Sequence, residues 1–194
     1  FMGGTDAGDA TSIILRAIQG AMLPDDLRIS VVMGRCAPAL DDVRSLAASL
    51  PWATDILVDV SDMAALMADA DLAIGAGGSA TWERCCLGLP SIIVETAKNQ
   101  SEVVAAMTAR GSVSLPLLPM RDFEDRLISA LKQAASSLGE LSSSAARVCD
   151  GSGASRVVDV LCASIFDVRR ATTQDALDVW RWRNEGGGAA FYLR

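Results

Sequence analysis

The stretch GAGGSATWERCCLGLPSIIVE at residues 75–95 decides the fold. With the apolar residues just before it, it predicts a strand over 71–77, then a bare glycine turn, a helix over 79–88 and a second strand over 90–95. Short apolar runs separated by a helix are typical of parallel strands that are covered on both faces.

The same alternation runs outward from this stretch in both directions. Further strands are expected at 28–34, 55–60 and 112–117, and Phe1 and Met2 look like the end of another. Between the strands, helices are expected at 9–22, 39–50, 62–69 and 100–110. Beyond Pro119 only helices are expected, at 120–138, 140–148 and 151–164. The sequence therefore predicts an α/β fold, a doubly wound, mostly parallel Rossmann-like sheet with carboxyl-terminal helices.

The chain is expected to divide after residue 164. Residues 1–164 form the Rossmann-like domain. Residues 165–194 are interpreted as a strand, a turn capped by Thr172 or Thr173, and a helix through Asn184. One strand and one helix cannot bury a core. The second segment is therefore a docked appendage or the truncated opening of another domain.

Composition excludes several classes of function. The 194 residues are 51% hydrophobic and 21% charged, and the net charge is −7 without a basic run. We therefore expect a folded protein without a nucleic-acid surface. No apolar run reaches the ~20 residues that span a bilayer, and we expect a cytoplasmic protein with no membrane span.

The chain has no histidine and five cysteines, none of them in a CxxC pair. This excludes histidine-based catalysis within the chain and argues against a zinc site. We expect no catalytic residue, no metal and no cofactor here, and reduced, mostly buried thiols.

The glycine turn is a candidate phosphate site. Gly77 and Gly78 offer backbone freedom, Ser79 can cap the helix, and the first N–H groups of that helix attract anions. Glu83, one helical turn further on, can accept hydrogen bonds from ribose hydroxyls, as acidic residues do in dinucleotide folds. The alternative is that Glu83 only favours the positive helix start and faces water.

Two further segments are expected at the same edge of the sheet. The first is the glycine turn at Gly3 and Gly4, before a helix that begins near Asp9. The second is TAKNQSEV (96–103), where Asn99 and Gln100 can donate hydrogen bonds to sugar or phosphate oxygens. An ordinary tight loop and simple helix capping are the alternatives for these two segments. The acidic residues Asp6, Asp9, Asp62 and Glu95 are interpreted mostly as loop or cap residues.

Together, GGTDAG, DVSDMAALMADADLAIGAGGSATWERCCLGLPSIIV and AKNQ resemble the carboxyl-terminal half of the UDP-sugar hydrolase of pseudaminic acid biosynthesis, a relative of MurG. The resemblance covers about residues 1–164 and implies one half of a GT-B fold. It also implies that Gly77, Gly78 and Ser79 meet the UDP diphosphate and Glu83 the ribose. Further positions follow from the same resemblance: Val60 meets uracil through its backbone, Gly4 and Thr5 lie on the phosphate side, and Asn99 and Gln100 face the sugar.

The implied reaction cleaves UDP-2,4-diacetamido-2,4,6-trideoxy-β-L-altropyranose to UDP and free sugar, with a histidine base in an amino-terminal domain of the parent chain. Without that domain we expect weak binding of UDP and no catalysis. The alternatives are half of a MurG-like glycosyltransferase and a non-catalytic nucleotide-sugar-binding domain. The segment DVRRATTQDALDVWRWRNE also resembles the opening of a GNAT acetyltransferase, which implies a fused parent protein.

Overall fold

The structure is a computed structural model, and it describes residues 1–115, 121–163, 169–170 and 172–185, with the backbone alone at 182–185. It divides into two compact units, Phe1–Asp150 and Gly151–Arg194. The sequence predicts a division after residue 164, whereas this grouping places helix α8 (Gly153–Ala163) with the later residues. In the described part of the chain, no helix is both long and apolar enough to cross a bilayer.

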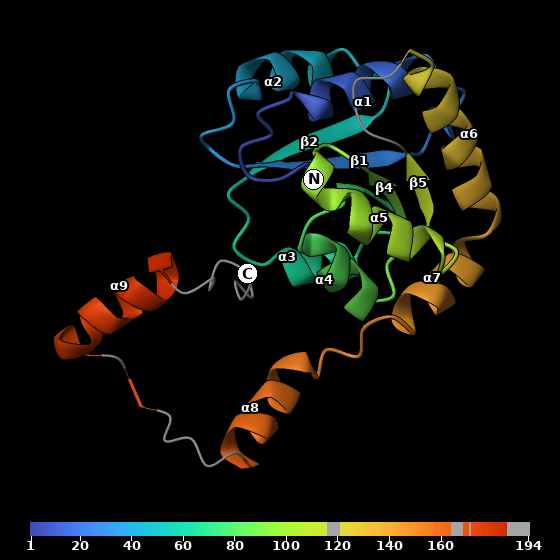
Figure 1. Cartoon of the computed structure of the whole chain (residues 1–194). Coiled ribbons are helices and arrows are strands. Elements are labelled where there is room, and N and C mark those ends of the chain that lie inside the picture. Colours follow the sequence, from blue (N-terminus) through green and yellow to red (C-terminus); the bar gives the residue numbers. More distant parts are fainter. Residues whose placement is uncertain (116–120, 164–168, 171, 186–194) are drawn as a thin grey trace. The chain divides into compact units, whose positions relative to one another are not determined.

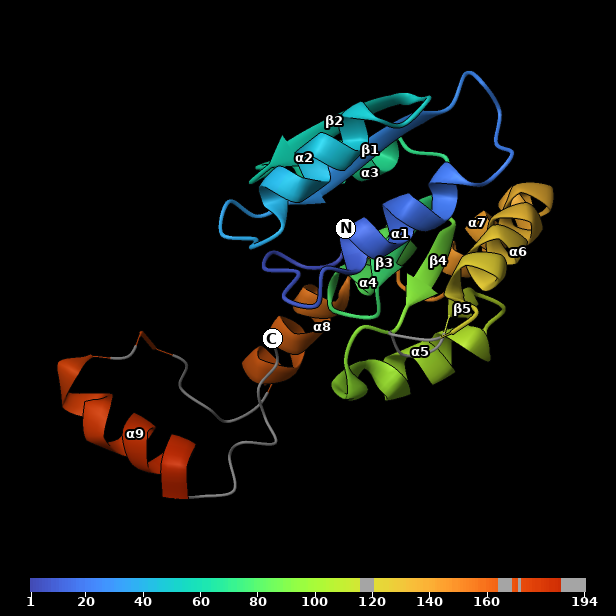
Figure 2. The ribbon, with the colours of Figure 1, turned by 90° about the horizontal axis from the view of Figure 1, so that it is seen from above.

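The first unit is built on two groups of parallel strands (Figures 1 and 2). Strand β1 (Arg28–Met33) pairs with β2 (Ala53–Val58), with Arg28 opposite Ala53. Strand β3 (Ala73–Ala76) pairs with β4 (Ser91–Val94), and β4 pairs with β5 (Val113–Leu115). The predicted parallel α/β fold is confirmed.

Most of the predicted strands are placed within a few residues, but β2 lies two residues earlier than expected. Asp59 ends it, because this residue adopts a left-handed backbone with φ 51°, which no strand residue has. Its amide donates to the Met33 carbonyl oxygen, and its carboxylate pairs with Arg35. The end of the 112–117 strand falls outside the described residues.

The amino-terminal residues link the two strand groups. The Phe1 amino group donates to the Ile74 carbonyl oxygen, and the Ala76 amide donates to the Phe1 carbonyl oxygen. Three residues later, the Gly4 carbonyl oxygen accepts from the Gly34 amide, just beyond β1. Phe1 thus pairs with β3 as a strand residue would, which agrees with the predicted strand end.

Helices cover both faces of the strands (Figure 1). Helices α1 (Ala10–Gln19), α2 (Leu40–Ala48) and α6 (Phe123–Ser136) lie on one face, and α4 (Ala80–Cys86) and α5 (Ser101–Thr108) lie on the other. Helix α3 (Met63–Ala68) leads from β2 towards β3, and α7 (Leu138–Ala146) packs against α4.

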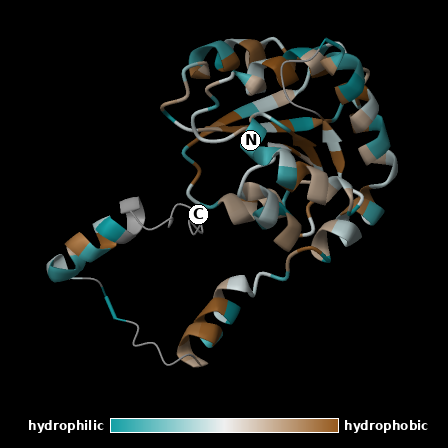
Figure 3. Cartoon of the chain, in the orientation of Figure 1, coloured by the Kyte–Doolittle hydropathy of each residue, from teal (hydrophilic) through white to brown (hydrophobic). Residues whose placement is uncertain are grey.

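The core follows the two-residue period of the central strand. Ile92 and Val94 join the cluster under α1 and α6, whereas Ile93 joins the cluster under α4, α5 and α7. All three side chains are fully buried, and the strands stand out as hydrophobic in Figure 3. The expectation of mostly buried thiols is wrong: Cys85 is buried in the cluster around Ile93 and Cys149 is half-buried, but Cys36, Cys86 and Cys162 are exposed.

The second unit has two described helices, α8 and α9 (Ala176–Glu185), and a short 3-10 turn, η2 (Thr173–Asp175). Thr172 makes a capping box with Asp175. Of the two caps that the sequence offered, Thr172 and Thr173, the structure uses Thr172. Arg169 adds a bidentate ion pair to the same carboxylate at 2.7 and 2.6 Å, which holds the pKa of Asp175 well below its usual range. The predicted strand at the start of this segment and the GGGAAFYLR tail lie largely outside the described residues.

Candidate functional site

The turn after β3 leaves backbone donors unpaired. The Gly77 amide donates to the Val94 carbonyl oxygen at 3.2 Å and so continues the β3–β4 ladder. The next N–H groups, those of Gly78, Ser79 and Ala80, have no hydrogen-bond acceptor in the described part of the chain. Three consecutive free amides can bind an anion, because they can donate hydrogen bonds to its oxygens in place of the water that solvates them.

This corrects the expectation for Gly77. Its amide is already used, so Gly78 and Ser79 remain as candidate phosphate donors and Ala80 joins them. Neither Gly77 nor Gly78 has a positive φ, so backbone freedom is not the reason for the glycines. A Cβ at position 77 would lie 2.8 Å from Val104 Cγ2, whereas one at position 78 would meet nothing within 4 Å. Gly77 is required by the packing of α5, and the space at Gly78 is open.

Ser79 and Glu83 are exposed at the start of α4. Ser79 occupies the N-cap position, but its side chain makes no capping hydrogen bond, so the predicted cap is absent. Its backbone is already helical there, with φ −59° and ψ −34°, whereas a capping residue normally adopts extended angles. Glu83 lies in the first turn, and its carboxylate has no hydrogen-bond partner among the described residues. Both polar groups are therefore available to a ligand.

Arg84 is a buried cation beneath this turn, and it had received no role from the sequence. Its side chain is 2% exposed, and Nη2 donates to the Ala76 carbonyl oxygen and to Thr81 Oγ1, both at 3.1 Å. No acidic side chain pairs with it in the described residues. Burial lowers the pKa of the guanidinium to about 10, so it stays charged at neutral pH. The guanidinium packs against Gly75, where a Cβ would be 2.4 Å from Nη1.

The first glycine loop is organised differently. Gly3 has φ 102°, a conformation that favours glycine, and the Gly4 carbonyl oxygen is bound to Gly34. Asp6 is buried, and its two carboxylate oxygens accept from the amides of Ala10 and Thr11 at 3.0 and 2.9 Å. The start of α1 is thus satisfied internally by Asp6. Thr5 is exposed and free of described partners.

Of the other acidic loop residues Asp9, Asp62 and Glu95, one caps a helix. Asp62 accepts from the Ala65 amide and caps α3, and Glu95 accepts from the Ser101 hydroxyl. Asp9 precedes α1 without capping it, and its Oδ1 is buried without a partner. No group of three or more metal-capable side chains gathers among the described residues.

The segment after β4 approaches the Gly77 turn. The Cβ of Gln100 would lie 3.3 Å from a Cβ at Gly77, so these two candidate residues are neighbours. The Gln100 carboxamide bonds to Thr96: Oε1 accepts from the Thr96 amide at 3.0 Å, and Nε2 donates to the hydroxyl at 3.1 Å. Gln100 therefore holds the turn in shape, and its side chain is less available to a sugar than expected.

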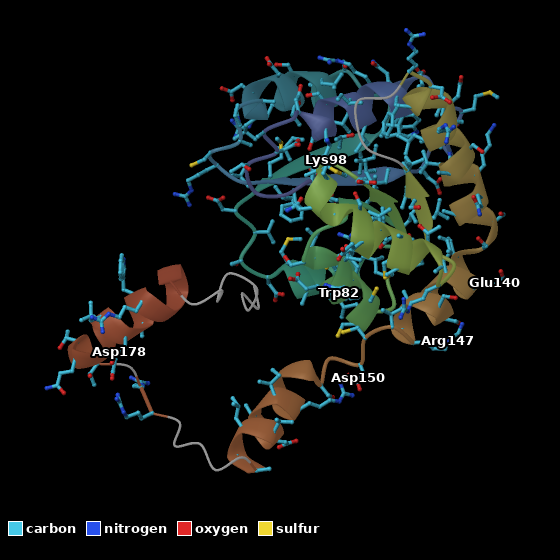
Figure 4. All side chains as sticks on the ribbon, in the orientation of Figure 1. Trp82, Lys98, Glu140, Arg147, Asp150 and Asp178 are labelled. Atoms are coloured by element: carbon cyan, nitrogen blue, oxygen red, sulfur yellow. The ribbon has the colours of Figure 1, made fainter. Side chains whose placement is uncertain are left out.

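Asn99 and Lys98 are more available than Gln100. Asn99 is exposed in the short 3-10 turn η1 (Lys98–Gln100), does not cap a helix, and has no hydrogen-bond partner in the described part of the chain. Lys98, labelled in Figure 4, adds an exposed cation to this segment and had received no role from the sequence.

Val60 is half-buried in the link between β2 and α3. It follows Asp59, whose contacts with Met33 and Arg35 fix the end of β2. No described hydrogen bond joins Val60 to the other candidate residues. The structure brings together the turn at Gly77–Glu83 and the segment at Lys98–Gln100, while Val60 belongs to the β1–β2 group.

Comparison with known proteins adds to this geometry. No family model matches the chain. Over 113 residues, 57% of the chain, it is 29% identical to the spore coat polysaccharide biosynthesis protein SpsG of Bacillus subtilis (strain 168), and the match spans 32% of that protein. The chain thus spans about a third of the length of this curated relative.

Among solved structures, the crystal structure of Acinetobacter baumannii MurG matches 84% of the chain with a TM-score of 0.71 and 18% identity, over 48% of MurG. The glycotransferase of kitacinnamycin matches 74% of the chain with a TM-score of 0.47 and 18% identity, over 45% of that protein. The chain is a distant relative of SpsG, and its fold is that of one half of the GT-B protein MurG.

Proposed function

We propose that the chain is the UDP-binding half of a nucleotide-sugar hydrolase in polysaccharide biosynthesis. The observation that carries the proposal is the open turn at Gly78–Ala80, which presents three free amides, with Ala76 and Thr81 on either side of it bonded to the buried Arg84 cation. Support from outside the site comes from the relative SpsG, whose name concerns polysaccharide biosynthesis, and from the MurG-like fold.

In this proposal the UDP diphosphate is held by the amides of Gly78, Ser79 and Ala80. Each charge-assisted hydrogen bond contributes about 1.5–3 kcal/mol. The unneutralised charge of Arg84 adds a favourable field in a region of low dielectric, where charge interactions are stronger than in water. This local arrangement explains how a chain with a net charge of −7 accepts an anion.

The other roles follow from position. Glu83 accepts hydrogen bonds from the ribose hydroxyls, the Val60 backbone meets uracil, and Gly4 and Thr5 flank the phosphates. Asn99 and Gln100 face the sugar, which we propose is the 2,4-diacetamido-2,4,6-trideoxy-altropyranose of UDP-linked pseudaminic acid precursors. Because the chain has no histidine, water activation is assigned to an amino-terminal domain of a longer parent protein.

The second candidate is half of a MurG-like glycosyltransferase, which the fold match to MurG favours. Both candidates use the same UDP site. They differ in the acceptor, which is water in the hydrolase and a hydroxyl of another sugar in the transferase. The stretches WERCCLGLP and KNQ favour the hydrolase modestly. The acetyltransferase-like interpretation of residues 165–194 stays a prediction.

Calorimetric titration tests the site with UDP and ADP. We expect UDP to bind more tightly than ADP, and Glu83→Gln to weaken UDP binding by about 1–3 kcal/mol, as for the loss of a hydrogen bond to a charged group. The matched control is Glu140→Gln, because Glu140 is also an exposed glutamate in the first turn of a helix, α7. Figure 4 shows Glu140 away from Lys98, which lies in the segment after β4.

Equal binding of UDP and ADP would contradict a uridine site. If Glu83→Gln and Glu140→Gln both bind UDP as the unchanged protein does, Glu83 has only its helix-start role. Melting temperatures of both variants, measured without ligand, confirm that neither substitution has disturbed the fold.

A further inference from the structure

Two cysteine side chains meet at the surface of the first unit. Cys86 Sγ lies 3.5 Å from Cys149 Sγ, in the range of a hydrogen bond between thiols, although the two residues are 63 positions apart in the chain. Both are free thiols; Cys86 is exposed and Cys149 is half-buried. A small molecule can therefore reach one sulfur directly, and the second sulfur lies beside it.

The carboxyl end of α4 holds Cys86 in place. Cys86 is the last residue of this helix, and the Gly88 amide closes the helix by donating to the Cys85 carbonyl oxygen. Gly88 has φ 63°, the left-handed backbone with which many helices end. A Cβ at this glycine would lie 3.4 Å from Ser142 Oγ of α7, so the end of α4 is packed closely against α7.

The segment after α7 holds Cys149 on the other side of the contact. The Val148 amide donates to the Ala145 carbonyl oxygen at 2.9 Å and keeps the chain close to the helix end. Val148 and Cys149 pack against the buried cluster that includes Cys85 and Ala145. The meeting of the two sulfurs thus follows from the packing of α4 against α7, not from a chance approach of two mobile side chains.

The other three cysteines are placed differently. Cys85 is 3% exposed, and burial raises the pKa of its thiol, which disfavours the reactive thiolate. Cys36 and Cys162 are exposed, but neither has a sulfur contact among the described residues. An exposed single thiol can form a mixed disulfide with a small molecule, but it has no neighbour with which to complete an exchange.

We propose that Cys86 and Cys149 form a thiol–disulfide exchange site whose substrate is a low-molecular-weight disulfide. The Cys86 thiolate attacks one sulfur of the small disulfide, forms a mixed disulfide and releases the first small thiol. The Cys149 thiolate then attacks the Cys86 sulfur, forms the protein disulfide and releases the second small thiol. The protein gives up two electrons and two protons, and the small disulfide takes them up as two thiols. This inference does not depend on the proposed function.

The geometry suits the second step of this exchange. A disulfide requires a sulfur–sulfur distance of about 2.05 Å. The sulfurs are already in contact, so rotation of the two side chains supplies the remaining approach. The bond would close a long loop, from the end of α4 to the segment after α7. Such a cross-link restricts the unfolded chain and so stabilises the folded one.

The test uses the whole chain with Cys36→Ser and Cys162→Ser, so that only the pair and the buried Cys85 can react. The reduced, folded chain is treated with oxidised glutathione. The hydrogen bond with Cys149 raises the pKa of Cys86, so the reaction is run at about pH 8.5, where the thiolate fraction is larger than at neutral pH.

We expect the intact mass to fall by two hydrogens, with no glutathione bound. Trypsin should then release residues 85–98 joined to residues 148–156. The midpoint of thermal unfolding should rise by about 5 °C or more, because a long loop has been closed. Dithiothreitol should reverse all three changes.

Two matched variants separate the steps. With Cys149→Ser added, Cys86 should keep one glutathione, because no second thiol displaces it, and the thermal midpoint should stay close to that of the reduced chain. With Cys86→Ser added, the joined peptides should disappear. Thermal midpoints of the reduced variants show whether either substitution disturbs the fold.

Three outcomes would overturn the proposal. The first is glutathione that stays on Cys86 although Cys149 is present, because the two sulfurs then do not reach each other. The second is a peptide link that survives Cys86→Ser, which would make Cys85 the partner. The third is a link found only in a disulfide-bonded dimer on a non-reducing gel, because the two cysteines then belong to different chains.

Discussion

The two glycine loops look alike in the sequence, yet they treat their helix starts in opposite ways. In the loop Gly3–Asp9, the Asp6 carboxylate takes the amides of Ala10 and Thr11, and Gly3 has the positive φ that glycine allows. In the turn Gly77–Ser79, no side chain caps α4, the amides of Gly78, Ser79 and Ala80 stay free, and Gly77 allows the close packing of α5. One loop is closed by its own carboxylate, whereas the other is open to an anion. The difference shows that a glycine turn before a helix is a ligand site only where the protein leaves its donors unused.

The largest effect is expected where the first loop is anchored. A Cβ at Gly34 would lie 2.3 Å from the Gly4 carbonyl oxygen, and backbone atoms cannot move aside as the end of a side chain can. Gly34→Ala should therefore reduce the free energy of unfolding by about 3 kcal/mol, as overpacking does. Gly78→Ala, with open space around its Cβ, should change it by less than about 0.5 kcal/mol. Urea denaturation measures both, and similar losses in the two variants would contradict the comparison.

The second effect concerns the Phe1 amino group, whose pKa makes stability depend on pH. Desolvation, and then repulsion from Arg84, lower the pKa of the Phe1 amino group from 8.0 to about 6, with Asp6 acting in the opposite direction. Between these two values the unfolded chain binds more protons than the folded chain, so stability should rise with pH from 6 to 8. The gain is at most about 2.7 kcal/mol, because a tenfold change in proton affinity corresponds to about 1.36 kcal/mol.

Urea denaturation at a series of pH values between 5 and 9 measures this gain. A variant with residues added before Phe1 is the control, because it has no ammonium at the Phe1 nitrogen, and its stability should be flat over the same range. A flat profile in the unextended chain would show that the Phe1 amino group remains hydrated.

The smallest effects separate the two helix starts directly. Asp6→Ala removes the acceptor of two amides and should cost about 1–2 kcal/mol of stability, as the loss of a cap does. Ser79→Ala should change stability by less than about 0.5 kcal/mol, because its hydroxyl makes no capping bond. Equal losses in thermal or urea denaturation would mean that both helix starts depend on their side chains.

The sequence was a good guide wherever a local period dominates. The alternation of apolar runs and amphipathic segments predicted the parallel strands. The acidic residues near strand ends were interpreted mostly as loop or cap residues; Asp6 and Asp62 do cap helices, whereas Asp9 does not. It was a poor guide wherever a residue's use depends on a distant partner. The amide of Gly77 is taken by Val94, the carboxamide of Gln100 by Thr96, and the buried position of Arg84 depends on Gly75.

By itself, the sequence determined the order of elements, the parallel α/β class and the clustering of glycine turns at one edge, because hydrophobic period and turn chemistry are local properties. Tertiary structure decided which amides at that edge stay free, that a cation without a described carboxylate partner lies beneath them, and that the sulfurs of Cys86 and Cys149 meet. These features arise from hydrogen bonds and packing between segments that are far apart in the chain, and no local pattern encodes them.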